Sequence, residues 1–135
     1  LRTPPLAGNS KRTAAEVIVL DQFSRNLHRD QPRTFACDSL ALALAQVAVA
    51  AGADQPLPPV QRAFLYMPYM HSEPAIHQIA VTLFSQPGME GNLDFELRHK
   101  AIIDRFGRYP HRNAILGRPS TAEEVAFLQT PGSSF

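Results

Sequence analysis

Three clusters of polar residues in this sequence combine side-chain types and spacings that could perform chemistry. The first lies in "LDQFSRN", where Asp21 and Arg25 stand four residues apart and can pair on one side of a helix. Gln22 and Asn26 share that arc with them. Apolar residues border the arc, so the cluster fits either a solvent-facing side or a buried aspartate–arginine network.

The second cluster is "HSE", which begins at His71. It fits a helix start, in which the serine caps the helix and Glu73 complements the helix dipole. It also fits an acid–base pair of His71 and Glu73, or a pair of metal ligands. No His-Glu-x-x-His motif, cysteine pair or Asp-rich loop accompanies it, so a metal site would have to recruit His99, His111 or Asp21 through the fold. We expect no metal and no cofactor.

The third cluster is "RFGRYPHRNAILGR", residues 105–118. Residues 98–118 hold six basic residues against one acidic residue, so this segment is strongly positive in a chain whose net charge is +1. We expect Pro110 to open a short helix whose free N–H groups, beside the guanidinium groups, form a site for an anion. The alternative is internal neutralisation by carboxylates such as Asp21 and Glu73. The candidate binding residues of this cluster are Arg105, Arg108, His111, Arg112, Asn113 and Arg118.

His99 precedes the basic segment and lies on the apolar seam of a helix expected over residues 93–106. A histidine in such a position usually bonds a buried carbonyl or carboxylate, and we expect the same here. The opposite face carries Glu96, Lys100 and Asp104 four residues apart, which indicates a solvated ladder of charges.

The elements that must position these clusters are all helical. Apolar side chains recur at helical spacing from residue 13 onwards, and the stripe of Val17, Leu20, Phe23 and Leu27 is expected to face the core. The segment 38–52 is apolar on nearly every side, with an aspartate as its cap. We therefore expect a central helix that is covered on several sides.

Proline, glycine and capping residues indicate where the other helices begin and end. We expect one helix over 60–70 that bends or ends near Pro68, one opened by the HSE cluster, and a last one capped by Ser120 and Glu123. The result is an all-α fold of about six helices, and no internal repeat of fixed length is found. The expected organisation is a flexible arm over 1–12, one helical domain over 13–129 and a tail over 130–135.

Composition limits the classes of partner. The net charge of +1 gives no attraction of the whole molecule to nucleic acid or to an acidic membrane. There is no tryptophan and no RNA-module motif, so we do not expect a nucleic-acid partner. A single cysteine, Cys37, cannot form an internal disulfide, which fits a reducing compartment. No signal peptide is found and no apolar run is long enough to span a bilayer, so we expect a cytoplasmic protein.

Three segments resemble the signature of a bacterial family, domain of unknown function nine-two-four. They are "LDQFSRNLHRD", "YMPYMHSE" and "RFGRYPHRNAILGRPSTAEEVAFL", in this order, and the resemblance covers about Val17 to Leu128. It implies tetratricopeptide-like helical hairpins and a shared set of polar residues, but no activity. Ser24 and Tyr109 stand where members more often have proline and phenylalanine. Members also carry an aromatic-rich N-terminal segment, which we expect this sequence to lack. Without that segment an apolar face of the remaining helices would be uncovered, and this would favour self-association.

We expect the three clusters to converge on one polar pocket. The leading interpretation is a non-catalytic binding or scaffold module whose cation-rich pocket takes a small anionic ligand or an acidic peptide end. One alternative is a hydrolase that uses His71, Glu73 or His111, with or without a metal. Another is an adaptor for a partner protein. Whether the protein is an enzyme stays open at this point.

Overall fold

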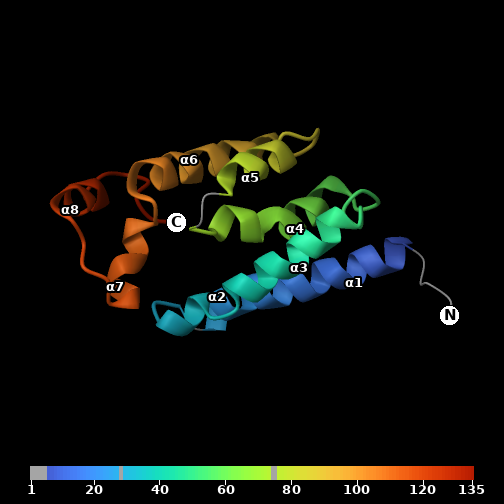
Figure 1. Ribbon diagram of the computed structural model, residues 1–135, viewed down its shortest axis with the longest axis horizontal. Helices are drawn as coiled ribbons and strands as arrows, with labels where there is room; N and C mark the ends of the chain where they lie inside the picture. Colours follow the sequence, from blue (N-terminus) through green and yellow to red (C-terminus); the bar gives the residue numbers. More distant parts are fainter. Residues whose placement is uncertain (1–5, 28, 74–75) are drawn as a thin grey trace.

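The computed structural model is an all-α fold (Figure 1). It describes residues 6–27, 29–73 and 76–135, and these ranges contain no strand. The fold class expected from the helical periodicity is therefore confirmed. In chain order the elements are α1 (Leu6–Ile18), η1 (Val19–Phe23), α2 (Ser24–Leu27), η2 (Pro32–Phe35), α3 (Asp38–Ala50), α4 (Pro59–His71), α5 (His77–Phe84), α6 (Glu90–Phe106), η3 (Pro110–Arg112), α7 (Asn113–Leu116) and α8 (Ala122–Leu128).

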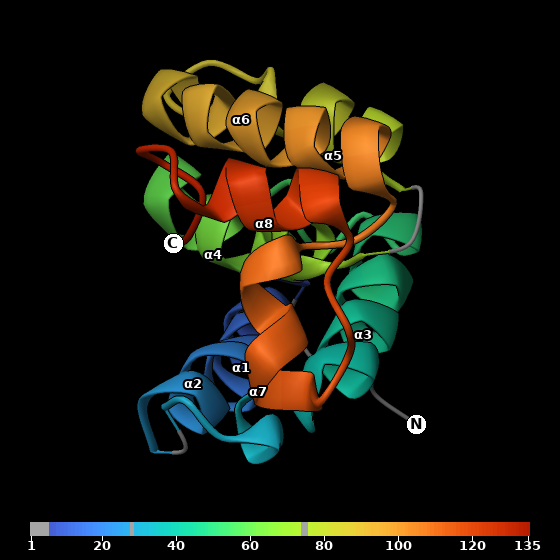
Figure 2. The ribbon, with the colours of Figure 1, turned by 90° about the vertical axis from the view of Figure 1, so that its left-hand side faces the viewer.

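α4 lies at the centre of the fold. It contacts α1 and α3 on one side and α5 and α6 on the other, while α1 also contacts α3 and α5 also contacts α6. Figures 1 and 2 show these two pairs as layers below and above α4, with α7 and α8 at the end of the molecule where α2 lies. The likeness to tetratricopeptide hairpins stays a prediction.

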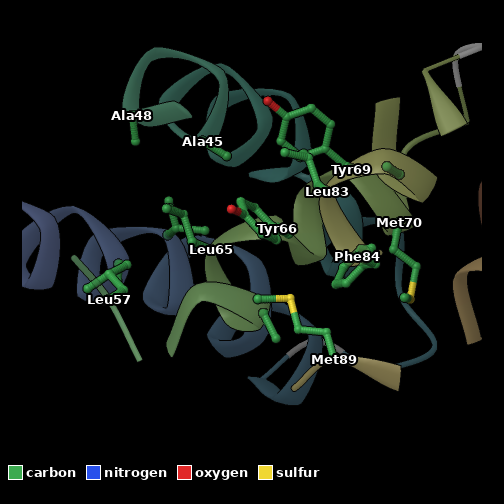
Figure 3. Packing of buried hydrophobic residues seen from close by; sticks show 14 of the residues in the cluster. Ala45, Ala48, Leu57, Leu65, Tyr66, Tyr69, Met70, Leu83, Phe84 and Met89 are labelled. Carbon is green, nitrogen blue, oxygen red and sulfur yellow. The ribbon is translucent and has the colours of Figure 1, made fainter. Parts of the chain in front are cut away.

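The main hydrophobic core surrounds α4 (Figure 3). The rings of Tyr66 and Phe84 pack edge to face with their centroids 5.8 Å apart, and Leu65 and Met89 are buried in the same cluster. Close packing of this kind makes each side chain costly to truncate, by about 2–5 kcal/mol for a buried leucine or phenylalanine. The core therefore fixes the position of α4, whose C-terminal end reaches the polar residues.

α3 buries one narrow face of small side chains, Ala41, Ala45 and Ala48. These alanines allow α1 and α4 to approach closely. The expectation of a central helix covered on several sides is wrong, because Leu40 and Val47 are 54% and 66% exposed. The segment Pro32–Ala50 is long and apolar enough to cross a membrane by length and composition alone, a test that core helices also pass.

The helical structure begins earlier than the sequence predicts. α1 starts at Leu6, so the flexible arm expected over 1–12 is wrong for residues 6–12, while residues 1–5 lie outside the described ranges. Ser10 is fully buried, and α1 contacts both α3 and α4. Packing thus stabilises a helix whose first residues carry few local helix signals.

The expected tail over 130–135 is packed onto the domain. Ser133 is buried, and its hydroxyl donates to the Leu128 carbonyl oxygen over 3.2 Å. The Phe135 ring lies against the ring of His99 in α6. Figures 1 and 2 both show this end of the chain beside α4. Periodicity did not reveal the contact of Phe135 with His99 because these two residues are distant in the sequence.

A π-helical turn, η1, interrupts the first helical rod. One extra residue in a turn rotates the side chains that follow by about 100° around the helix axis. Asp21 therefore faces inward and is 1% exposed, whereas Phe23 and Leu27 are 57% and 62% exposed. The expected apolar stripe is correct at Val17 and wrong at Phe23 and Leu27. The prediction assumed 3.6 residues in every turn, and the π-helical turn contains one residue more.

The junction between α4 and α5 also differs from the expectation. α4 continues through the buried Pro68 and ends at His71, and α5 begins only at His77. Ser72 follows the last residue of α4 in an extended conformation. The interpretation of "HSE" as a helix start is therefore wrong, which leaves Glu73 available for partners elsewhere in the chain.

The ends of α6 and α8 follow local rules. Gly107 has a φ of 71° and ends α6, a left-handed conformation that side-chain-bearing residues adopt at a cost. α8 begins with a capping box of Thr121 and Glu124. This box lies one residue later than the expected pair of Ser120 and Glu123, although the capping chemistry is the same.

A buried pair of ionisable side chains joins α5 to α6. His77 Nδ1 lies 2.9 Å from a Glu96 carboxylate oxygen, and the side chains are 2% and 0% exposed. Burial raises the pKa of Glu96, and the bond with His77 opposes that effect. Glu96 is thus wrongly included in the expected solvated ladder, whereas Lys100 and Asp104 do pair on the outer face over 2.7 Å.

We predict that Glu96→Ala destabilises the protein strongly. The substitution leaves Nδ1 of the buried His77 imidazole without the carboxylate that it contacts, and breaking a buried pair costs about 3–5 kcal/mol. Urea unfolding followed by circular dichroism measures the loss. Glu16→Ala, at an exposed site in α1, is the control and should stay within about 0.5 kcal/mol of wild type. A loss for Glu96→Ala no larger than the control's would contradict the prediction.

Candidate functional site

The buried carboxylate of Asp21 is the centre of the first cluster. Its Oδ1 lies 2.9 Å from His71 Nδ1 and 3.1 Å from Arg25 Nη1, and Gln22 Nε2 donates to Oδ2 over 2.6 Å. Burial opposes ionisation, but the hydrogen bond and charge of His71 and the charge of Arg25 outweigh it. The pKa of Asp21 is therefore lower than its usual value. A buried network, not a solvent-facing side, describes this cluster.

Arg25 bridges two carboxylates from different elements. Its Nη1 and Nη2 donate to the two oxygens of Asp38 over 2.7 and 2.9 Å, and Nη1 also donates to the Asp21 carbonyl oxygen over 2.9 Å. Such a two-pronged bond holds both side chains in one geometry. The N-cap position of α3 is Cys37, so the capping role expected for Asp38 is wrong.

Glu73 is held by the basic segment. Arg118 Nη1 and Nη2 donate to its two carboxylate oxygens over 2.9 and 3.0 Å, and the Tyr109 backbone N–H donates over 2.8 Å. Burial raises the pKa of Glu73, but these bonds outweigh it and leave that pKa below its usual value. The carboxylate that His71 contacts belongs to Asp21, so the structure does not support the alternative of an acid–base pair of His71 and Glu73.

Arg108 is neutralised on the other side of the same segment. Its Nε and Nη2 donate to Glu124 over 2.9 and 2.7 Å, and these bonds hold the pKa of Glu124 far below its usual range. Asn113 is buried between the two pairs: it donates to Glu124 over 3.3 Å and accepts from Arg118 Nε over 3.0 Å. Internal neutralisation thus describes Arg108 and Arg118, and the anion site expected at the short helix start does not form around them.

Arg112 has a different environment. Its guanidinium lies between the rings of Phe35 and Tyr109, 4.4 and 4.8 Å from their centroids. Nη2 donates to the His71 carbonyl oxygen over 2.7 Å, and the ion-pair contact of Nη1 with Asp38 is long, at 4.0 Å. Nε is buried and has no hydrogen-bond partner among the described residues. The positive charge of Arg112 is therefore only weakly compensated.

Two neutral histidines stand near Arg112. His99 Nδ1 donates to the Phe95 carbonyl oxygen over 2.6 Å, so the predicted bond to a carbonyl is confirmed. His111 Nδ1 is buried, and the described part of the chain offers it no hydrogen-bond partner. Burial lowers the pKa of His99 and of His111 to about 4, so neither ring is charged at neutral pH.

These side chains surround a cavity of about 740 Å³, which we call the central cavity. It lies among η1 and α2, the C-terminal end of α4, α6 and η3. Of the predicted site residues, those that line it are Gln22, Arg25, Asn26, His71, His99, His111 and Arg112. A second cavity of about 280 Å³ is lined by Glu73 and shares His71, Arg112 and Phe35 with the first.

The remaining predicted residues do not line the central cavity. Asp21 lies behind His71 and positions it. Arg105 is exposed at the end of α6, with its guanidinium 4.6 Å from the Phe106 ring centroid. Arg108, Asn113 and Arg118 belong to the adjacent ion-pair network. The fold therefore brings the three clusters together, but it uses much of the positive charge to hold helices.

Several residues of the site are absent from the predicted set, among them Asp38, Phe35, Arg29 and Phe135. Asp38 was assigned to a cap, Phe35 lies in a short turn without periodicity, and Phe135 lies in the expected tail. Only the aromatic character of Phe135 in an otherwise polar tail could have drawn attention to it. Within the described ranges, no group of three or more His, Cys, Asp or Glu side chains is suited to hold a metal ion.

A family model described as "Bacterial protein of unknown function (DUF924)" matches residues 4–132. None of the curated proteins matches the chain. Among solved structures, it is similar to the protein of unknown function ATU0120 from Agrobacterium tumefaciens, at 38% sequence identity and a TM-score of 0.84. That match covers 89% of this chain and 68% of the other.

We predict that Glu73→Gln lowers the free energy of unfolding in a pH-dependent way. The native carboxylate has a pKa below 4.5, so its contribution is complete above that pH and disappears as the pH falls through the native pKa. The loss should be about 1–3 kcal/mol at pH 7 and should shrink towards pH 3. Urea unfolding at pH 7, 5 and 3 measures it, with the exposed Glu123→Gln as control. If wild type and Glu73→Gln differed in free energy of unfolding by the same amount at all three pH values, the result would count against the prediction.

Proposed function

The chain belongs to the bacterial family of unknown function DUF924, and we propose that it is a binding module whose central cavity takes a small anionic ligand. The charged group of that ligand would be a carboxylate, a phosphate or the acidic end of a peptide. The surrounding helices act as the scaffold, because the ion pairs described above hold the cavity walls. We propose a cytoplasmic location from the single cysteine, Cys37.

Incomplete pairing of two adjacent residues carries this proposal. Native proteins pair nearly all buried polar atoms, and a buried group left without a partner costs about 1–3 kcal/mol. Among the described residues, three buried side-chain nitrogen or oxygen atoms have no hydrogen-bond partner, and two of them belong to His111 and Arg112. Both residues line the central cavity. An oxygen of a bound anion would give Arg112 Nε the acceptor that it lacks.

Electrostatics also favour Arg112 as the residue that holds the anion. Arg25 already pairs with Asp21 and Asp38, so most of its charge is compensated. Arg112 has its long contact with Asp38 and two aromatic faces that exclude water. A guanidinium in such surroundings attracts an anion more strongly than one in bulk water. Arg29, exposed at the rim of the cavity, adds a second positive charge.

We predict that small carboxylates and phosphates raise the melting temperature of the wild-type protein. A ligand that binds only the native state stabilises it by about 2.7 kcal/mol at a hundred times its Kd. Arg112→Gln should abolish this shift. Because Arg112 also supports packing, the exposed Arg29→Gln provides a second variant, and removal of its charge should weaken binding about fivefold.

Arg105→Gln is the matched control for these variants. It removes one arginine of the same segment that lies outside the central cavity, so anion affinity should stay as in wild type. Thermal shift gives a first ranking of anions, and isothermal titration calorimetry gives the affinities. Binding that is unaffected by Arg112→Gln and Arg29→Gln, or the lack of any shift across a broad panel of carboxylates and phosphates, would refute the proposal.

A second function, ester hydrolysis, is favoured by the orientation of His71. Asp21 Oδ1 holds Nδ1 at 2.9 Å, and the His71 side chain lines the central cavity. In this reaction Nε2 takes a proton from water while the water oxygen attacks the ester carbonyl carbon. The carbon–oxygen bond to the alcohol then breaks, and the alcohol oxygen receives the proton. Glu73 takes no part, because Arg118 holds it.

Nitrophenyl esters test this second function. We predict that His71→Gln lowers the rate of hydrolysis at least about 100-fold, the usual contribution of a general base. Asp21→Asn should lower it as well, because Nδ1 then loses its carboxylate partner. Arg105→Gln should keep the wild-type rate. Hydrolysis by the wild-type protein no faster than in buffer, or full activity in His71→Gln, would show that the His71–Asp21 pair is structural.

A further inference from the structure

The ring of Phe135 forms part of the wall of the central cavity, in a position bounded by three other rings, which we call the recess. The centroid of the Phe135 ring lies 3.7 Å from that of His99, 4.6 Å from that of His111 and 5.2 Å from that of Tyr109. The three partner residues come from α6 and from the segment around η3, so two parts of the chain build the recess. Phe135 is a fourth ring, contributed by the segment that follows α8.

The recess suits a planar ring without charge. Both imidazoles are neutral at pH 7, because burial lowers the pKa of His99 and of His111 to about 4. Neutral imidazole and phenol rings stack on an aromatic ring or meet its edge, and each such pair contributes about 0.5–1.5 kcal/mol beyond area burial. A planar aromatic group of a ligand would make the same contacts as Phe135.

Phe135 is only partly covered for a ring that touches three others. It remains 53% exposed, and the Ser133 hydroxyl, which donates to the Leu128 carbonyl oxygen, anchors the segment in which it lies. Meanwhile Nδ1 of His111, whose ring packs on Phe135, is sealed from water without a partner among the described residues. A sealed polar atom beside a half-exposed ring indicates an arrangement that another occupant could improve.

The recess adjoins the cation that holds the anion in the proposed function. The Tyr109 ring contacts the Arg112 guanidinium at 4.8 Å and the Phe135 ring at 5.2 Å. One molecule could therefore reach both positions, with its anionic group at Arg112 and its ring in the place of Phe135. The carboxylate or phosphate group sets the charge, and the aromatic part sets the shape.

We propose that Phe135 occupies the subsite for the aromatic part of the ligand, and that the central cavity takes small aromatic anions, which displace Phe135 when they bind. This inference rests on the proposed function, since Arg112 is to hold the anionic group. It adds the class of ligand and a means of control: the protein's own ring competes with the ligand. With such a competitor, the apparent Kd of the ligand equals the intrinsic Kd divided by the fraction of molecules in which Phe135 has left the site.

Calorimetric titration of wild type and Phe135→Ala with three probes tests the inference. Benzoate has the ring and the anionic group, cyclohexanecarboxylate has the same size without a planar ring, and inorganic phosphate has only the anionic group. If Phe135 leaves the recess in about a tenth of the molecules, Phe135→Ala should bind benzoate about tenfold more tightly. Affinity for phosphate should change less than about twofold, because phosphate does not need the recess.

The wild-type protein supplies a measurement that needs no variant. Benzoate should shift the ring-proton NMR signals of His99 and His111, because one aromatic ring replaces another beside them, and cyclohexanecarboxylate should not produce the same shifts. Weaker or unchanged benzoate binding in Phe135→Ala, or equal gains for benzoate and cyclohexanecarboxylate, would overturn the inference. Phosphate binding that still depends on Arg112 would then leave the proposed function standing. If no probe binds to either protein, both proposals fail.

Discussion

One buried carboxylate, that of Asp21, determines how the first helical rod packs against the C-terminal end of α4. Asp21 lies in a helix next to the protein interior, where an ionised group is stable only with partners. It obtains them from its own rod through Arg25 and from the end of α4 through His71. Removal of any one partner would leave a charge buried, so the arrangement of η1 against α4 is tightly specified.

The ion pairs of the basic segment serve the same purpose at the other end of the cavity. Arg118 binds Glu73, and Arg108 binds Glu124. These bonds fasten the segment after α6 to the end of α4 and to α8. Arg105 is exposed to water, so Arg112 is the buried arginine of this segment whose charge is only weakly compensated, and this contrast favours an anionic ligand at Arg112.

The apolar and polar parts of the central cavity come from different sources. The helices contribute the fixed wall, which includes His99 in α6 and His71 at the end of α4. The segment after α8 contributes Phe135, which covers neutral rings that would otherwise face the cavity. A binding module of the proposed kind needs both, because the charge orients a ligand and the shape of the recess selects it.

The sequence by itself determined the all-α fold and most of the helices, because helical spacing, caps and glycine stops act within one or two turns. Some of the polar residues that line the central cavity, such as His71 and Arg112, also stood out by their type. The sequence could not determine which faces are buried: a single extra residue in η1 turns Asp21 inward and Phe23 outward. Nor could it reveal the partners of His71 and Glu73, which lie 50 and 45 residues away. Those pairs depend on how the helices stack, and local spacing holds no information about contacts over such distances in the chain.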